Sequence, residues 1–462
     1  MTNSIVIKKK LKNFNKKIVV SGDKSLSIRW VLFASLASGN SKAQNLLISE
    51  DVKAAIKTVR KLGIKVILNN KFCKIFGKGI NGFNYKRNLT LNAENSGTLG
   101  RLILGFLINT TKPIKLIGDK SLSTRDFKRI SDPLSKFGGV FKLKNKKNLP
   151  LTIYESKNLR PISYLENRGS AQCKSAVIFA GMRTSGTTLI KAKKSRNHTE
   201  LMCKYLKLPV TVENKKNYDL IKVKKVKEIK PFDYKIPSDI SSSAFFIILT
   251  ALSKNSKLLI KDVNINPTRI GVISILKKMG VNIIFQNQKI YKGEKLADIK
   301  IEGGKKLKAI NCPTSLNSGA IDEFLVIFLV AAKAKGISYF KDSNSHPKLD
   351  NLIQNNQICT NDLILAELIP LLQIKNQKTP LSPVRPKTPS PVRVTPRSPS
   401  PNYIYVGGRK IPLRRKPASP AKAKEGRLRK VVRRVLHGRT EEEKMMKLAK
   451  ALRKRALAAS AR

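Results

Sequence analysis

The sequence predicts an α/β fold built from repeated units, and two observations indicate this class. Residues 22–29 return almost unchanged as residues 118–125, which indicates a chain assembled from copies of one unit. Segments that open with small or polar residues and then run into an apolar helix also recur about every 70–75 residues. These segments begin at Ser21, Asn95, Gly169, Ser238 and Ser318.

A second repeated element, a helix end followed by a strand, lies between those helix starts. Gly63, Gly138 and Gly280 each follow a helical run and precede residues of high strand propensity, and glycine just past a helix is a common stop signal. Residues 206–212 take the same place in the third copy. Each unit is therefore predicted to run strand, helix, strand, helix, strand.

The first helix start is a candidate anion site. Lys24 precedes the apolar run 30–37, which reads as a buried helix whose free N–H groups and positive dipole end attract an anion. Ser25 and Arg29 lie four residues apart and therefore share one helix face. Their hydroxyl and guanidinium can converge with the Lys24 ammonium on a carboxylate or phosphate. The alternative is a solvated helix start with an ordinary lysine.

Two different compositions share the chain of 462 residues, which is long enough for two or more domains and carries a formal net charge of +64. Residues 1–377 contain 57 Lys and 11 Arg, whereas residues 378–462 contain 11 Lys and 14 Arg. The first composition is typical of an AT-rich genome, so its lysines are weak evidence for nucleic-acid binding. The second is a candidate for binding a polyanion.

Cysteine, histidine and apolar patterns exclude several classes of protein. The five cysteines are widely spaced and the chain has only three histidines, so we expect neither a disulfide framework nor a metal site. The N-terminus shows no signal peptide, and no apolar run reaches the roughly eighteen residues of a membrane span. We therefore expect a cytoplasmic protein without membrane contact.

Seven motifs, taken in order, resemble those of the 5-enolpyruvylshikimate-3-phosphate synthase family. They lie at residues 21–25, 95–101, 118–122, 170–176, 195–200, 266–269 and 321–324. The resemblance covers about residues 1–340 and implies an inside-out α/β barrel with its active site between two domains of βαβαββ units. It implies a first domain of residues 1–20 and 231–341 and a second domain of residues 21–230. A sister family that acts on UDP-N-acetylglucosamine shares this fold, but residues 170–172 and 195–200 favour shikimate phosphate.

The resemblance implies the substrates shikimate 3-phosphate and phosphoenolpyruvate, with no metal and no cofactor. Lys24 would touch both substrates and serve in proton transfer, and Asp322 would accept the proton of the attacking 5-hydroxyl. The remaining implied ligands are Ser25 and Arg29 for shikimate 3-phosphate, Gly97 and Arg125 for phosphoenolpyruvate, Ser170, Ala171 and Gln172 for the shikimate phosphate and ring, and Arg196 for phosphate.

Each of these assignments has a structural alternative. Residues 170–172 can simply start a helix. Asp322 and Glu323 precede an apolar run, where acids are stabilised by the helix dipole without any catalytic role. Asp126 follows Arg125 where the family often has proline, so the orientation of Arg125 is open. We expect His198 to be structural.

After residue 340 the sequence departs from the family. The resemblance implies an Arg-x-Lys-Glu-x-x-Arg stretch and then a sixth unit, and neither occurs in the sequence. We therefore expect impaired turnover, together with exposed strand edges and apolar surface in the first domain. Residues 342–378 are predicted to be aperiodic, residues 379–423 a disordered Pro/Ser-rich linker, and residues 424–462 a basic helical tail with a capping box at Thr440 and Glu443.

Two functions compete at this point. The first is enolpyruvyl transfer by a monomeric enzyme. The alternative is a basic nucleic-acid-associated protein that carries a degenerate transferase domain.

The tail yields a prediction that does not depend on the resemblance. Residues 378–462 hold 25 Lys and Arg against 4 Glu. If about six of these cations meet phosphates, log affinity for duplex DNA should fall with log salt concentration with a slope of about −5, with little dependence on base sequence. Fluorescence anisotropy of a labelled duplex at several salt concentrations measures this slope. Equal binding by a chain that lacks residues 378–462 would assign the affinity to the lysines of residues 1–377 instead.

Overall fold

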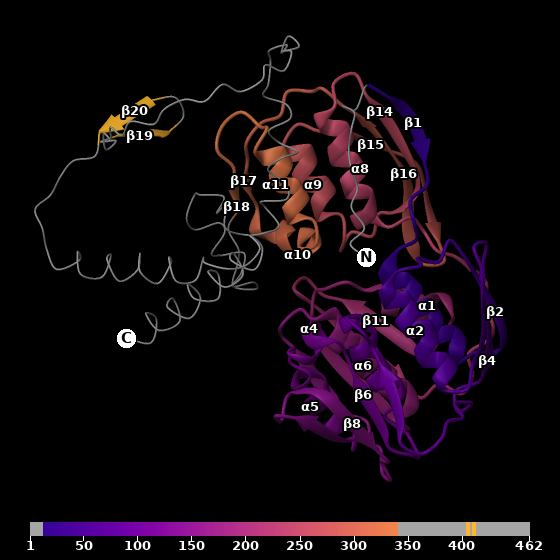
Figure 1. The fold of residues 1–462 in the computed structure, drawn as a ribbon. Helices are drawn as coiled ribbons and strands as arrows, with labels where there is room; N and C mark the ends of the chain where they lie inside the picture. Colours follow the sequence, from indigo (N-terminus) through magenta and orange to yellow (C-terminus); the bar gives the residue numbers. More distant parts are fainter. Residues whose placement is uncertain (1–12, 341–402, 407–408, 413–462) are drawn as a thin grey trace, which may run out of the picture. The chain divides into compact units, whose positions relative to one another are not determined.

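Two separate hydrophobic cores organise the computed structural model, which describes residues 13–340, 403–406 and 409–412. The larger core belongs to residues 21–236, here called the large lobe, and the smaller core to residues 13–20 and 237–340, the small lobe (Figure 1). Both lobes belong to one compact unit, residues 1–378, and residues 379–462 form a second unit.

The large lobe contains three copies of one βαβαββ unit. In each copy the first two strands are parallel, and the fourth strand lies antiparallel between the second and the third. The first copy comprises β13 (Tyr234–Lys235), α1 (Lys24–Ser35), β2 (Ser38–Gln44), α2 (Glu50–Lys61), β3 (Lys65–Leu68) and β4 (Cys73–Lys78). The second comprises β5 (Leu89–Asn92), α3 (Gly97–Phe106), β6 (Ile114–Ile117), α4 (Lys120–Ser123), α5 (Lys128–Lys136), β7 (Val140–Lys144) and β8 (Asn148–Tyr154). The third comprises β9 (Ser163–Glu166), α6 (Ala171–Arg183), β10 (Thr187–Lys193), α7 (His198–Tyr205), β11 (Val210–Asn214) and β12 (Tyr218–Lys224).

The small lobe contains one complete copy and the beginning of another. The complete copy has the same strand order and comprises β1 (Asn15–Ile18), α8 (Ile240–Leu252), β14 (Lys257–Asn264), α9 (Gly271–Lys278), β15 (Asn282–Tyr291) and β16 (Glu294–Glu302). The next comprises β17 (Asn311–Cys312), the 3-10 helix η1 (Thr314–Leu316), α10 (Asn317–Ala320), α11 (Phe324–Ala331) and β18 (Tyr339–Phe340). Its two strands are parallel, as are the first two strands of every other copy.

The first strand of two copies comes from a distant part of the chain. β1, at the start of the described chain, pairs with β14 of the small lobe, and β13, which follows the third copy, pairs with β2 of the large lobe. The chain therefore passes between the lobes twice. At this crossing Gly22 bridges Ser238, and a Cβ atom on Gly22 would come within 2.0 Å of the Asn45 carbonyl oxygen. Only glycine fits there.

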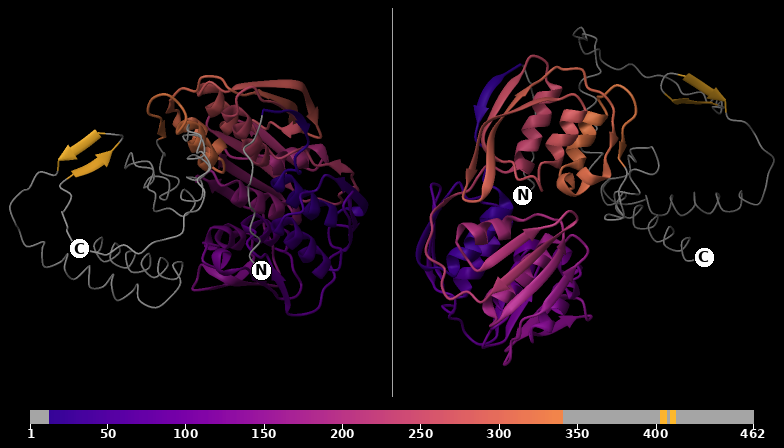
Figure 2. Two further views of the ribbon diagram at one scale, coloured as in Figure 1. Left: turned by 45° about the horizontal axis from the view of Figure 1, so that its top comes forward. Right: turned by 180° about the vertical axis from the view of Figure 1, so that it is seen from behind.

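Helices fill the interior of the large lobe and sheets cover its outside (Figures 1 and 2). Nearly every residue of α1 and α6 is buried, as expected of helices that are apolar all round. Phe33, Phe106 and Phe179 join α1, α3 and α6, with ring centroids 6.1, 5.4 and 4.0 Å apart. The predicted α/β class and its inside-out arrangement are confirmed.

The predicted helix starts and stops are confirmed at most copies. Asp23, Ser96, Ser170 and Asp239 each cap a helix with a side-chain oxygen. Gly63, Gly138 and Gly280 have φ values of 87°, 103° and 89°, which favour glycine. In the third copy a non-glycine residue, Lys207, adopts the same left-handed conformation with φ of 54°.

Apolar side chains are exposed on one face of α8, as expected for the small lobe. Phe245, Phe246 and Leu249 are 63%, 42% and 45% exposed, whereas Ile247 and Ile248 on the other face are buried.

The predicted segments beyond residue 340 lie almost entirely outside the described residues. These are the aperiodic segment, most of the linker and the basic helices of residues 424–462. Within the second unit the structure describes one antiparallel pair, β19 (Tyr403–Val406) with β20 (Arg409–Pro412). Among the described residues the cysteines are free and buried. No helix in the same ranges is long and apolar enough to cross a membrane.

The aromatic cluster of the large lobe makes a stability prediction. Phe179→Ala should destabilise the protein by about 3–5 kcal/mol, because it removes buried ring contacts and leaves a cavity. The only tryptophan, Trp30, lies in the same core, so its fluorescence during urea unfolding reports the change. Leu165→Ala in the same lobe is the control, because Leu165 is 62% exposed and its loss should change stability by less than about 0.5 kcal/mol. Equal effects of the two changes would contradict the packing argument.

Candidate active site

Among the capped helices of the large lobe are α1, α3 and α6. Asp23 accepts the Leu26 N–H of α1 at 2.9 Å, and Ser96 accepts that of Leu99 in α3 at 3.2 Å. Ser170 accepts the Cys173 N–H of α6 at 3.3 Å. Each cap uses one N–H of the first turn, so the positive dipole end and the other N–H groups can serve an anion.

Lys24 is the first residue of α1 and lies beside the crossing. Its backbone N–H donates to Asp239 Oδ2 at 3.0 Å, which ties the start of α1 to the start of α8. Its side chain is 50% exposed, with Nζ 3.8 Å from Asp51 Oδ2. An exposed pair at that distance is weak, so a ligand can recruit the ammonium.

Gly97 and Arg125 lie together, as the resemblance implies. A Cβ atom on Gly97 would be 3.0 Å from Arg125 Nη1, so any side chain at this position would crowd the guanidinium. Arg125 Nη2 donates to Asn95 Oδ1 at 2.9 Å and to Ser121 Oγ at 3.4 Å. These bonds hold the guanidinium beside the start of α3.

Arg101, which the sequence-based assignments left out, lies among the residues implied as substrate ligands. Its Nη1 donates to Gln172 Oε1, and Gln172 Nε2 donates to Thr98 Oγ1 at 3.0 Å. The two bonds join the start of α3 to the start of α6, where Ser170 and Gln172 lie. One signal was available, because Arg101 follows Gly97 by four residues and so shares its helix face.

Arg29 is buried, with only 3% of its surface exposed. Its guanidinium donates to Thr199 Oγ1 at 2.7 Å, to the Ser25 carbonyl at 3.0 Å and to Ser175 Oγ at 3.3 Å. Burial lowers its pKa to about 10, so the group stays cationic at neutral pH. The structure therefore places Arg29 between α1, α6 and α7, and its role as a substrate ligand stays a prediction.

Arg196 and Asp322 form an ion pair between the lobes. Arg196 Nη2 lies 2.6 Å from Asp322 Oδ2, and the side chains are 26% and 50% exposed. Burial raises the pKa of Asp322, but the charge and hydrogen bond of Arg196, with Arg269 and Lys24, outweigh it and hold that pKa below its usual value. Asp322, which the resemblance implies as the base, is thus bound by Arg196, which it implies as a phosphate ligand.

A buried contact between His198 of the large lobe and Glu294 of the small lobe joins the two lobes. His198 Nδ1 lies 2.7 Å from Glu294 Oε1, and both side chains are buried. Asn264 and Asn266 donate to the other oxygen of Glu294 at 3.2 and 3.1 Å. This network fits the structural role expected for His198.

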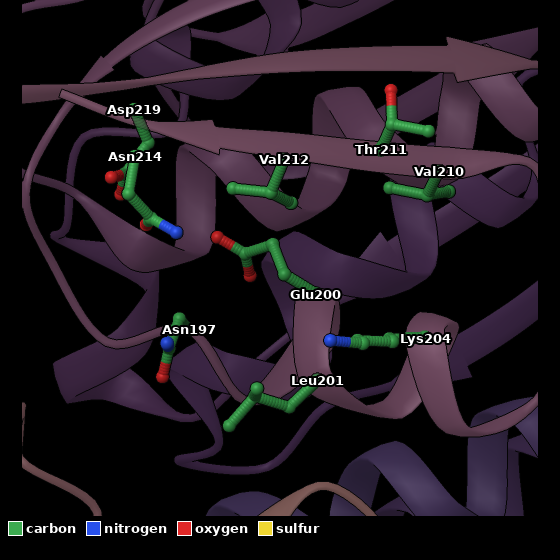
Figure 3. Close-up of a pocket in the computed structure, with 9 residues that line it drawn as sticks. All are labelled: Asn197, Glu200, Leu201, Lys204, Val210, Thr211, Val212, Asn214 and Asp219. Carbon is green, nitrogen blue, oxygen red and sulfur yellow. The ribbon is translucent and has the colours of Figure 1, made fainter.

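A cavity of about 380 Å³ lies between α7 and the strands β11 and β12. Figure 3 shows Glu200 projecting from α7 toward Val212 of β11. Within the described chain its lining includes Asn197, next to Arg196, but none of the residues implied as substrate ligands. Nor do the described residues contain a group of three or more His, Cys, Asp or Glu side chains that could hold a metal ion.

Comparisons with known proteins agree with the resemblance. Residues 8–347 match the family described as EPSP synthase (3-phosphoshikimate 1-carboxyvinyltransferase). The chain is 39% identical over 361 residues to the 3-phosphoshikimate 1-carboxyvinyltransferase of Ruthia magnifica, which covers 78% of this chain and 79% of that protein. It is 37% identical to the protein of the same name from Petrotoga mobilis, over 72% of this chain and 76% of the relative. The EPSP synthase structure from Acinetobacter baumannii has a TM-score of 0.65 and 35% identity, over 70% of this chain and 73% of that one.

The interlobe ion pair predicts a measurable pKa shift. Arg196→Gln should raise the pKa of Asp322, because it removes the strongest group that holds this pKa down. Since the folded-state pKa lies below the unfolded value of about 3.9, the pair stabilises the protein above that pH. The stabilisation is lost as the pH falls through the lower folded value.

Carboxyl ¹³C NMR titration measures the shift, and Asp322→Asn identifies the signal. Arg125→Gln is the control, because Arg125 does not contact Asp322. An unchanged pKa in Arg196→Gln would contradict the assignment of the shift to this pair.

Proposed function

The chain belongs to the EPSP synthase family, and from this premise we propose that it transfers the enolpyruvyl group of phosphoenolpyruvate to the 5-hydroxyl of shikimate 3-phosphate, releasing phosphate. The family match over residues 8–347 carries this proposal. The distribution of charge supports it, because Lys24 and Arg125 lie at the capped starts of α1 and α3. Together with Arg196 before α7, these cations suit two substrates that both bear phosphate and carboxylate.

The reaction needs positioned acids, bases and cations. The 5-hydroxyl oxygen attacks C2 of phosphoenolpyruvate, Asp322 accepts the hydroxyl proton, and C3 gains a proton to give a tetrahedral adduct. Loss of phosphate from C2 and of a proton from C3 then restores the double bond in the product. Lys24 neutralises phosphate charge and takes part in proton transfer.

Because Arg196 is paired with Asp322, substrate binding should also change the pKa of Asp322. A phosphate that binds Arg196 competes with Asp322 for the same guanidinium. When Asp322 loses this partner its pKa rises, because the cation that held the pKa down now faces the phosphate. The carboxylate thereby becomes a stronger base as the substrate arrives.

Several expectations about this protein stay predictions from the sequence. These are nucleic-acid binding by residues 378–462, a monomeric state, a cytoplasmic location and the role of each substrate ligand.

Binding of shikimate 3-phosphate tests the proposed function. Isothermal titration of the full chain should give saturable heat with this ligand, since most of its proposed ligands lie before residue 340. Lys24→Gln should weaken binding by about tenfold or more, the loss of one charge-assisted contact. The control is Lys53→Gln, because Lys53 is an exposed lysine of α2 paired with Glu50.

We expect phosphate release to be slow, because one missing preorganised cation typically costs about 10²–10³ in rate and the Arg-x-Lys-Glu-x-x-Arg stretch is absent from the sequence.

Two outcomes would count against the proposal. No heat from a folded sample at millimolar ligand would reject shikimate 3-phosphate as substrate. Equal affinity in Lys24→Gln and Lys53→Gln would remove Lys24 from the site.

A further inference from the structure

Arg269 is a buried cation with no part in the reaction proposed above. It precedes α9 in the small lobe and is only 4% exposed. Its Nη2 donates to Ser241 Oγ at 2.7 Å. Two carboxylates flank it, with Asp23 Oδ2 3.9 Å from Nη1 and Glu323 Oε1 3.9 Å from Nη2.

The three partners of Arg269 stand at the starts of three helices. Asp23 caps α1 and directly precedes Lys24. Ser241 lies in the first turn of α8, and its hydroxyl donates to Glu323 Oε1. Glu323 directly precedes α11 and directly follows Asp322. The guanidinium therefore contacts the immediate sequence neighbours of both proposed catalytic residues.

A fourth group extends this network to the backbone of Lys24. Asp239 caps α8 by accepting the N–H groups of Ser241 and Ser242 at 2.6 and 3.3 Å. Its other oxygen accepts the N–H of Lys24 at 3.0 Å. Asp239 thus joins the first turn of α8 to the first turn of α1 across the crossing.

The charges make Arg269 indispensable to this arrangement. Asp23, Asp239 and Glu323 are buried or nearly so, and three carboxylates at close range repel one another. Burial raises the pKa of Asp239 and of Glu323, and Arg269 opposes both shifts. For Asp23, Arg269 is the strongest influence that lowers the pKa against burial. Without the guanidinium the carboxylates would separate or take up protons, and either change alters the helix caps.

We propose that Arg269 is a positioning residue that fixes Lys24 and Asp322 relative to each other across the two lobes. It acts on Lys24 through Asp23, and on Asp322 through Ser241 and Glu323. The planar guanidinium is required, because a lysine ammonium is a single point charge that cannot span partners on three sides. The ligand assay below rests on the proposed function, whereas the exchange assay does not.

The test uses the full chain with two substitutions and two matched controls. Arg269→Lys keeps the positive charge but loses the planar guanidinium with its several donors. Ser241→Ala removes the hydroxyl that links Arg269 to Glu323 without leaving an unpaired buried charge. Arg183→Lys is the first control, because Arg183 is a buried arginine of α6 that bonds to Asn109 and Asn81. Ser243→Ala is the second, because its buried hydroxyl donates to the Asp239 carbonyl and not to Arg269.

Calorimetry with shikimate 3-phosphate gives the first readout. Arg269→Lys should lose about tenfold in affinity or more, because a displaced Lys24 loses its charge-assisted contact with the ligand. Ser241→Ala should lose less, and both controls should stay within about twofold of the unchanged chain. Should Arg269→Lys not fold, Ser241→Ala against Ser243→Ala carries the comparison. Wild-type affinity in both Arg269→Lys and Ser241→Ala would overturn the proposal.

The pH dependence of shikimate 3-phosphate binding distinguishes the positioning role of the Arg269 guanidinium from the effect of its charge. Arg269→Gln should move the acid limit of binding to higher pH, because the pKa of Asp23, which caps α1 beside Lys24, rises when the cation is removed. Arg269→Lys should move this limit back toward that of the unchanged chain while its affinity remains low. Recovery of both limit and affinity in Arg269→Lys would show that charge alone matters and would overturn the positioning role.

Amide exchange of Lys24 tests the proposal without any substrate. Its N–H should exchange faster in Arg269→Lys than in the unchanged chain, because the bond to Asp239 depends on the network. The rate should be unchanged in Arg183→Lys. If the unchanged chain gives no heat with shikimate 3-phosphate, the proposed function fails, and this exchange rate still decides the role of Arg269. Equal rates in Arg269→Lys and the unchanged chain would overturn it.

Discussion

The exchange of first strands between the lobes determines where the reactive groups lie. Because β1 completes a small-lobe sheet and β13 a large-lobe sheet, the chain must cross between the lobes twice. The crossings bond to each other, Asp23 N–H to the Pro237 carbonyl at 2.8 Å and Asp239 N–H to the Ser21 carbonyl at 3.0 Å. A helix starts shortly after each crossing, so the starts of α1 and α8 meet, and the Asp239 side chain bonds to the Lys24 N–H between them. Lys24 stands at this junction.

Acidic residues are scarce in this chain, so their positions are informative. Only 29 Asp and Glu accompany 93 Lys and Arg, yet Asp23, Asp239, Glu294, Asp322 and Glu323 all lie where the lobes meet. Most lysines stay exposed, where a charge interacts with the solvent and contributes little to the fold. At the junction Asp23, Asp239, Glu294 and Glu323 are instead buried and bound to partners, so their geometry is fixed. The general lysine excess therefore says little about function, whereas these few acids mark the junction where the proposed site lies.

The sequence predicted those features that depend on local chemistry. A capping side chain before an apolar run marks a helix start wherever it occurs, so Asp23, Ser96, Ser170 and Asp239 were recognisable. Glycine stops were equally local, and only Lys207 departs from that pattern. Contacts between distant segments were beyond this reasoning. Nothing near Arg101 or Arg269 in the sequence indicates that one bonds to Gln172 and the other lies between Asp23 and Glu323. Seven ordered motifs identified the family because their order depends on the whole chain.

The two lobes contribute differently to the proposed reaction. In the large lobe three helices pack around Phe33, Phe106 and Phe179, so the starts of α1, α3 and α6 are held by a complete core. In the small lobe the described residues form one complete sheet, and α8 exposes Phe245 and Phe246. The exposed apolar face of α8 lowers the stability of the small lobe and leaves the packing of the large-lobe core unchanged. The groups proposed to hold shikimate 3-phosphate stand mainly on the complete core, whereas Asp322 depends on the small lobe. Affinity and turnover can therefore respond separately to changes in this protein.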